Sequence, residues 1–130
     1  SGAVKQLSTS TYWSDLDYLL IDMPPGTGDA YLTIFNDIKI DNFIIITTPS
    51  ILALADVKKT INLIEKFNIP ILGYIENNFF DSKPIKDDIF QDKKIFKLGS
   101  FKFNKKMENF KIENAVDDAD LITKEIIKKC

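Results

Sequence analysis

Short apolar runs alternate with amphipathic segments along the chain before residue 78. The first run, 17–22, ends in Asp22 and is followed by prolines and glycines, which is typical of a buried central strand with a polar exit. Two further runs, 43–46 and 71–75, are rich in Ile and are also predicted to be strands. The continuous apolar character of 43–46 indicates a strand buried on both faces.

Helical spacing appears between these runs. After Gly28, Asp29 is a candidate N-cap, and the following apolar residues predict a short amphipathic helix with the stripe Leu32, Phe35 and Ile38. A longer helix is predicted between the second and third runs, with the stripe Leu54, Val57, Ile61 and Ile64. Strands that alternate with helices indicate parallel crossovers, so the predicted fold class is α/β, with an open, mostly parallel sheet and helices on both faces.

The rest of the chain is less regular. Residues 77–94 are polar and are expected to form a long loop with one helical turn. A further strand is predicted at 95–98. The last helix has acidic residues at its start and lysines at its end, as the helix dipole favours, and its expected packed stripe is Ala119, Ile122 and Ile126.

Size and composition narrow the classes of function. With 130 residues and 45% hydrophobic content, the chain is expected to be one domain or part of one. A formal net charge of −2 gives no electrostatic reason to bind nucleic acid or an anionic membrane. The single cysteine, Cys130, excludes an internal disulfide framework, and we expect a reducing, cytoplasmic setting.

Polar and unusual sequence follows three of the predicted strands, at 22–29, 47–50 and 76–78. In open α/β sheets, ligands bind outside the carboxyl ends of the strands, so these segments predict a site at one edge of the sheet. Asp22 followed by Pro-Pro-Gly-Thr-Gly suits a nucleotide hydrolase, which needs a carboxylate near Mg²⁺ and backbone N–H groups near a terminal phosphate. The alternative from spacing alone is a strand cap followed by a simple turn.

The full string Asp-Tyr-Leu-Leu-Ile-Asp-Met-Pro-Pro-Gly-Thr-Gly-Asp at 17–29 resembles the Walker B and switch II region of the Mrp/ApbC-type ATPases. These are P-loop proteins of the wider MinD/ParA group and include the cytosolic iron–sulfur cluster carriers. The blocks 46–57 and 69–77 are similar to the next two characteristic blocks of that family, and 97–104 is similar more loosely to a late strand and loop. The resemblance covers most of the chain except 78–94.

The resemblance implies roles for five residues. Asp22 would hold Mg²⁺ through water and help to place the attacking water, and Gly26 would lie by the γ-phosphate. Asn77 matches the asparagine that contacts the adenine edge. Phe103 and Asn104 would border the adenine pocket.

Two departures from the family pattern limit what this chain can do alone. The Walker A string Lys-Gly-Gly-x-Gly-Lys-Ser/Thr is absent from the 130 residues, and so are its phosphate cradle and lysine. We therefore expect 1–130 to be the C-terminal part of one P-loop NTPase domain, inactive alone, with ATP and Mg²⁺ as cofactors of the parent. The Cys-x-x-Cys pair that bridges a 4Fe–4S cluster in many members is also absent, since 77–84 contains no cysteine.

The leading hypothesis is an ATPase of iron–sulfur cluster assembly that acts as a nucleotide-gated homodimer and serves apo-proteins or scaffold proteins. One alternative is a MinD/ParA-like positioning ATPase. Such proteins usually carry a basic or amphipathic surface, whereas the last helix here begins with aspartates. The other alternative is a non-catalytic half-domain that folds or associates through an unpaired sheet edge.

Overall fold

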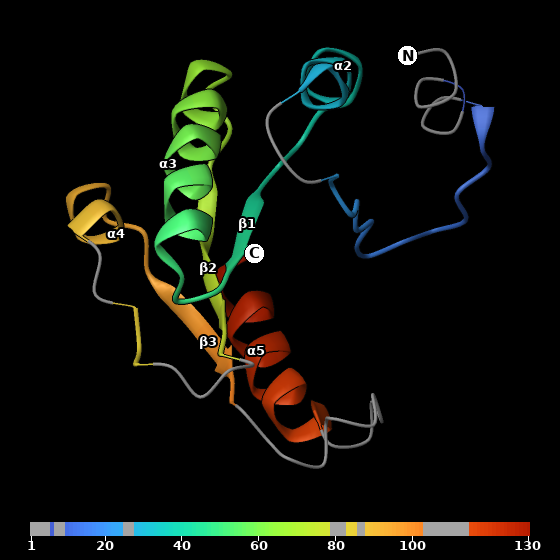
Figure 1. Cartoon of the computed structure of the whole chain (residues 1–130). Coiled ribbons are helices and arrows are strands. Elements are labelled where there is room, and N and C mark those ends of the chain that lie inside the picture. The colour runs from blue at the N-terminus through green and yellow to red at the C-terminus, as the bar shows by residue number, and fades with distance from the viewer. Residues whose placement is uncertain (1–5, 7–9, 25–27, 79–82, 86–87, 103–114) are drawn as a thin grey trace. The chain divides into compact units, whose positions relative to one another are not determined.

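The computed structural model describes residue 6 and residues 10–24, 28–78, 83–85, 88–102 and 115–130. The chain divides into two compact units, Ser1–Asp41 and Asn42–Cys130. The second unit contains the sheet, and Figure 1 shows its strands and helices. In the described part of the chain, no helix combines the length and apolar character needed to cross a membrane.

Three parallel strands form the sheet of the second unit. They are β1 (Phe43–Thr47), β2 (Ile71–Asn77) and β3 (Lys97–Phe101), in the order β1-β2-β3. Both pairings are parallel, because a helical connection returns the chain to the same end of the sheet each time. The predicted α/β class and parallel sheet are therefore confirmed, with β2 two residues longer and β3 two residues later than expected.

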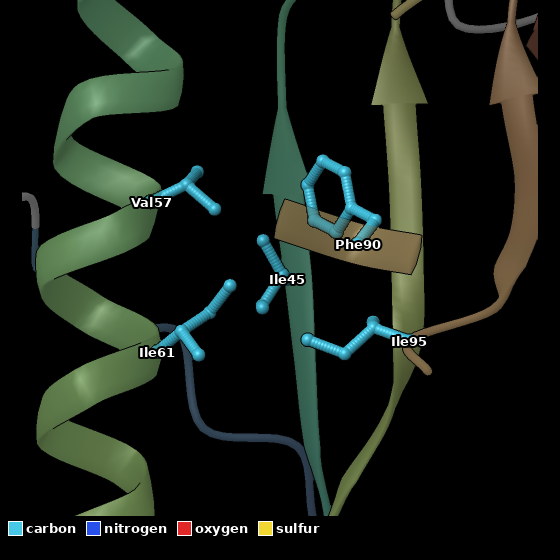
Figure 2. Packing of buried hydrophobic residues seen from close by; sticks show 5 residues of the cluster. All are labelled: Ile45, Val57, Ile61, Phe90 and Ile95. Atoms are coloured by element: carbon cyan, nitrogen blue, oxygen red, sulfur yellow. The ribbon is translucent and has the colours of Figure 1, made fainter. Parts of the chain in front are cut away.

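Helices α3 (Ile51–Lys66) and α4 (Asp88–Asp92) contribute to the apolar cluster on one face of the sheet. The predicted stripe of α3 is confirmed, since Val57, Ile61 and Ile64 are buried. Figure 2 shows Val57 and Ile61 pointing from α3 toward Ile45 of β1. The buried members of this cluster are Ile45, Val57, Ile61, Phe90 and Ile95.

Helix α5 (Val116–Lys129) covers the opposite face. Ile122 is buried against Ile75 of β2 and Leu98 of β3, and Ile126 packs at the margin of this second cluster. Residues 44 and 45 of β1 belong to different clusters, as expected when successive side chains point to opposite faces. Helices therefore lie on both faces of the sheet, as the sequence predicts (Figure 1).

The contact between β2 and β3 depends on Gly73. A Cβ at this position would lie 2.6 Å from the carbonyl oxygen of Phe96 and 2.7 Å from Leu98 Cγ. The register shifts here, since Tyr74 is opposite Lys97 whereas Ile75 is opposite Gly99. The irregularity leaves Leu98 as an extra residue that packs into the second cluster.

The first unit contains helix α2 (Asp29–Asp37). Gly28, not Asp29, is its N-cap residue, so the predicted start is displaced by one position. Tyr31 and Ile34 are buried, whereas Leu32 of the predicted stripe is exposed. The rings of Tyr31 and Phe35 meet edge to face with centroids 5.7 Å apart, so the aromatic pair defines the packed side of the helix.

Two sequence predictions are wrong. Residues 17–22 form no strand, and their apolar side chains are exposed, with Leu20 at 84%. A strand needs neighbours to pair its N–H and C=O groups, and no strand lies among the described residues of the first unit. Strand β1 is not buried on both faces, because Ile46 is 65% exposed: β1 is an edge strand, and α5 packs mainly on β3.

Candidate functional site

The carboxyl ends of the three strands meet at one edge of the sheet. Thr47 is opposite Glu76, Glu76 is opposite Ser100, and Asn77 is opposite Phe101. This edge is where parallel α/β sheets bind ligands, because loops and helix N-termini converge there. Two of the three polar segments predicted from the sequence, 47–50 and 76–78, lie at this edge.

Asn77 is the last residue of β2 and is half-buried. The next residue continues the pairing with β3, since the N–H of Asn78 donates to the carbonyl oxygen of Phe101 at 2.9 Å. The end of β3 is held in turn by α5, because the N–H of Lys102 donates to Asp118 Oδ2 at 3.1 Å. The backbone that presents Asn77 is therefore fixed from the β3 side.

Glu76 is a buried charged residue directly after a predicted apolar run, and its position in the sequence indicates no role. Its side chain is 2% exposed. Lys97 Nζ donates to Glu76 Oε2 at 2.9 Å, and the N–H of Ile85 donates to the same oxygen at 3.3 Å. The sequence signal for it was an acid at the end of an apolar strand, but its two donors come from 9 and 21 residues away in the chain.

The charge of Glu76 also affects Tyr74, which lies on the same face of β2. Burial raises the pKa of the Tyr74 hydroxyl, and the negative charge of Glu76 adds to that increase. The Tyr74 ring stacks on Phe90 of α4 with centroids 4.0 Å apart. The neutral phenol therefore belongs to the apolar cluster beneath the edge.

The other predicted site residues are distributed differently. Asp22 is exposed and belongs to the first unit, whereas Asn77 belongs to the second, so their participation in one site stays a prediction. Gly26, Phe103 and Asn104 lie outside the described residues. Phe101 ends β3 opposite Asn77, so the two segments that the resemblance assigns to adenine leave the sheet from neighbouring strands.

A metal-ligating cluster is not present among the residues that the structure describes. No group of three or more His, Cys, Asp or Glu side chains there could hold a metal ion. Cys130 is exposed at the end of α5, and the whole sequence contains no other cysteine. One thiolate does not suit a 4Fe–4S cluster, which is usually held by four cysteines.

A parallel sheet with helices on both faces and a polar carboxyl edge defines the class: an open α/β protein. The crystal structure of the cell division ATPase MinD from Pyrococcus furiosus has this fold, and the two superpose with a TM-score of 0.70 at 20% sequence identity. The superposition covers 99% of this chain and 57% of that one. At this identity the likeness shows the fold alone.

Sequence comparison then identifies the family. The profile of the ParA family described as NUBPL iron-transfer P-loop NTPase matches residues 1–122. The chain belongs to this family, and the resemblance to iron–sulfur cluster carriers of the Mrp/ApbC type is confirmed.

Two curated relatives, each called iron–sulfur cluster carrier protein, show the extent of the similarity. The protein of Pseudomonas fragi is 53% identical over 77 residues, which is 59% of this chain and 27% of the relative. That of Methanocaldococcus jannaschii is 54% identical over 78 residues, again 59% of this chain and 27% of the relative. The matched segment thus spans about a quarter of the length of these relatives.

Proposed function

We propose that this chain supplies the switch II and base-recognition parts of an ATP site in an iron–sulfur cluster carrier ATPase. The observation that carries the proposal is the family match over residues 1–122, together with Asn77 at the carboxyl edge of the parallel sheet. The phosphate-binding loop would come from polypeptide outside these 130 residues. The chain would then be the C-terminal part of one P-loop NTPase domain that works as a homodimer in the cytoplasm.

Asn77 has the chemistry that adenine recognition needs. A side-chain amide carries a donor and an acceptor side by side, which matches the N7 acceptor and N6 amino donor of adenine. The residue is half-buried at the end of β2, so a base bound there would be partly shielded from water. Phe103 and Asn104 follow β3, the strand next to β2, and are proposed to border the same base.

Asp22 is proposed to hold Mg²⁺ through water. Its carboxylate is exposed, so it can bind a hydrated cation without a desolvation penalty. Mg²⁺ would supply charge neutralisation at the phosphates, and Gly26 would bring backbone N–H close to the γ-phosphate. The chain's own contribution is thus a carboxylate and a backbone donor beside a phosphate cradle on other polypeptide.

The iron–sulfur cluster is proposed to be cargo. The names of the relatives state that they carry iron–sulfur clusters, but one cysteine in 130 residues does not fit cluster ligation by this chain. Cysteines from other polypeptide would be needed. The apo-proteins or scaffold proteins that receive the cluster are proposed partners of the complete assembly.

A chimaera tests the nucleotide proposal. The matching segment of the Pseudomonas fragi carrier would be replaced by this chain, so that the rest of that carrier provides the polypeptide proposed to contain the phosphate-binding loop. We expect the chimaera to hydrolyse ATP, and Asp22→Asn to lower kcat by about tenfold, because Mg²⁺ and the attacking water lose their carboxylate. The measurement is phosphate release at saturating ATP and Mg²⁺.

Asp15→Asn is the matched control, because it removes an exposed carboxylate from the same unit. It should leave kcat unchanged. A folded chimaera without ATPase activity, or one equally active with Asp22→Asn, would contradict the proposal.

A second candidate, the interaction half-domain, is favoured by the position of β1 at the edge of the described sheet. This strand pairs only with β2 in the described sheet, and Ile46, its second-to-last residue, is 65% exposed. Unpaired edges and exposed apolar residues promote association. The MinD-like positioning alternative gains no such support, since the likeness to MinD shows the fold alone and the first turn of α5 contains Asp117 and Asp118.

Ile46→Lys tests this second candidate. If the chain self-associates through the edge of β1, the wild type should elute as a dimer or larger species in size-exclusion chromatography with light scattering. A charge on the edge strand should shift it to monomer. Leu121→Lys is the control: Leu121 is 63% exposed but lies on α5. A monomeric wild type at all concentrations would exclude self-association.

A further inference from the structure

The buried carboxylate of Glu76 binds the backbone of Ile85, in the part of the chain that follows Asn77. Its Oε2 accepts the N–H of Ile85, nine residues further along the chain, at 3.3 Å. The same oxygen accepts Lys97 Nζ of β3 at 2.9 Å. One oxygen atom therefore connects the end of β2, the start of β3 and the chain that returns after Asn77.

A carboxylate at this position is costly unless it has partners. Glu76 is 2% exposed, and an unpaired buried charge would be strongly destabilising. An apolar side chain would fill the space with no such cost, since Tyr74 on the same face is already packed against apolar groups. The specific contribution of Glu76 is therefore to bind two donors and fix the backbone that carries them.

The two ends of the segment after Asn77 are held by different bonds. At the near end, the N–H of Asn78 donates to the carbonyl oxygen of Phe101. At the far end, the N–H of Ile85 donates to Glu76, and the Ile85 side chain packs against the cluster around Phe90. Successive residues of a strand point to opposite faces, so Glu76 acts on Asn77 through the backbone and not by direct contact.

We propose that Glu76 is a positioning residue that, through its bonds to Ile85 and Lys97, holds Asn77 in the orientation that recognises a purine base as adenine. This inference rests on the proposed function of Asn77. Adenine and guanine differ at the atoms that one amide can contact, so a wrongly oriented Asn77 would lose the discrimination. Glu76 itself would touch no nucleotide.

The test uses the 130-residue chain labelled with ¹⁵N, with AMP and GMP as probes. Nuclear magnetic resonance detects weak binding, so the phosphate-binding loop is not required. In the wild type we expect AMP to shift the side-chain amide of Asn77 more than GMP does, and Asn77→Ala to abolish the difference in the remaining signals. Amide hydrogen exchange at Ile85 is measured in the same samples.

Glu76→Leu removes the acceptor and keeps an apolar filling, whereas Glu76→Gln keeps an oxygen that can accept both donors. With Glu76→Leu we expect Ile85 to exchange at least tenfold faster and the preference for AMP to disappear. Ile61 should stay protected, which shows that the core is intact. With Glu76→Gln both properties should be retained. If Glu76→Leu does not fold, Ile85→Pro deletes the N–H donor together with the packing of the Ile85 side chain, and it should remove the preference. Ile85→Ala is its control, because it loses the packing but keeps the N–H, and it should retain the preference.

The outcomes separate the two proposals. If the wild type prefers AMP and Glu76→Leu, or Ile85→Pro in its place, keeps that preference, the positioning role is wrong and the role of Asn77 stands. If the wild type shows no preference, the base-recognition role of Asn77 is wrong and the positioning proposal fails with it. Unchanged exchange at Ile85 in a folded Glu76→Leu variant would also overturn the inference.

Discussion

Replacing Ile61 with alanine is expected to lower the free energy of unfolding by about 3 kcal/mol. Ile61 is fully buried, and its side chain points from the middle of α3 toward Ile45 of β1 (Figure 2). The substitution removes buried methyl and methylene groups and leaves a cavity that a helix packed on a sheet cannot close completely. The measurement is urea denaturation followed by circular dichroism.

Ile51→Ala is the control for this prediction, because it makes the same chemical change in the same helix at a side chain that is 88% exposed. It should alter the free energy of unfolding by less than about 0.5 kcal/mol. Equal losses for the two variants would contradict the packing of α3 on β1. They would also remove the support for helices on both faces of the sheet.

Gly73→Ala is expected to destabilise the chain by about 3 kcal/mol through overpacking. The added Cβ would stand 2.6 Å from the carbonyl oxygen of Phe96, which is backbone and cannot rotate away. Strand β3 would have to move from β2, and the bond from the N–H of Tyr74 to that oxygen, 2.9 Å long, would be weakened. Thermal unfolding should show the loss as a lower Tm.

Gly28→Ala provides the comparison, since a Cβ there meets no atom within 4 Å and Gly28 already has an extended backbone. Its cost should stay below about 1 kcal/mol, the scale of a changed N-cap. Because Gly73 lies four residues before Asn77, a shift of β3 would also displace the base-recognition edge. A Tm for Gly73→Ala equal to that of the wild type would contradict the close approach of β2 and β3.

Several exposed apolar residues of this chain lie in segments that could be buried only by neighbouring strands. Leu19 and Leu20 are exposed in a segment without strand pairing, and Ile46 is exposed on an edge strand. Both segments have the composition of buried parallel strands. Our proposal that the phosphate-binding half lies on other polypeptide accounts for this exposure, because additional strands would cover these residues.

The hydrophobic periodicity of the sequence was sufficient to predict the elements that stabilise one another within one strand–helix–strand unit. Ile45, Val57 and Ile61 pack as the periodicity of their segments predicts, and Pro70 separates α3 from β2 as expected. The prediction failed at 17–22 because an apolar run defines a strand only when other strands pair with it. Ile46 was wrongly predicted to be buried for the same reason, because a run of Ile residues does not determine how many strands pair with it.

At the candidate site, Asn77 and Glu76 show which features the sequence determines and which depend on the tertiary structure. The sequence by itself determined that a polar pair ends an apolar strand, and the resemblance supplied a role for Asn77. Only the tertiary structure decided that Glu76 is buried and bonded to Ile85 and Lys97, because hydrogen bonds across strands depend on register and on the register shift after Tyr74. Periodicity is a local property of the chain, and it determines which face of an element is apolar. The partners of a buried charge depend on how distant segments meet in space.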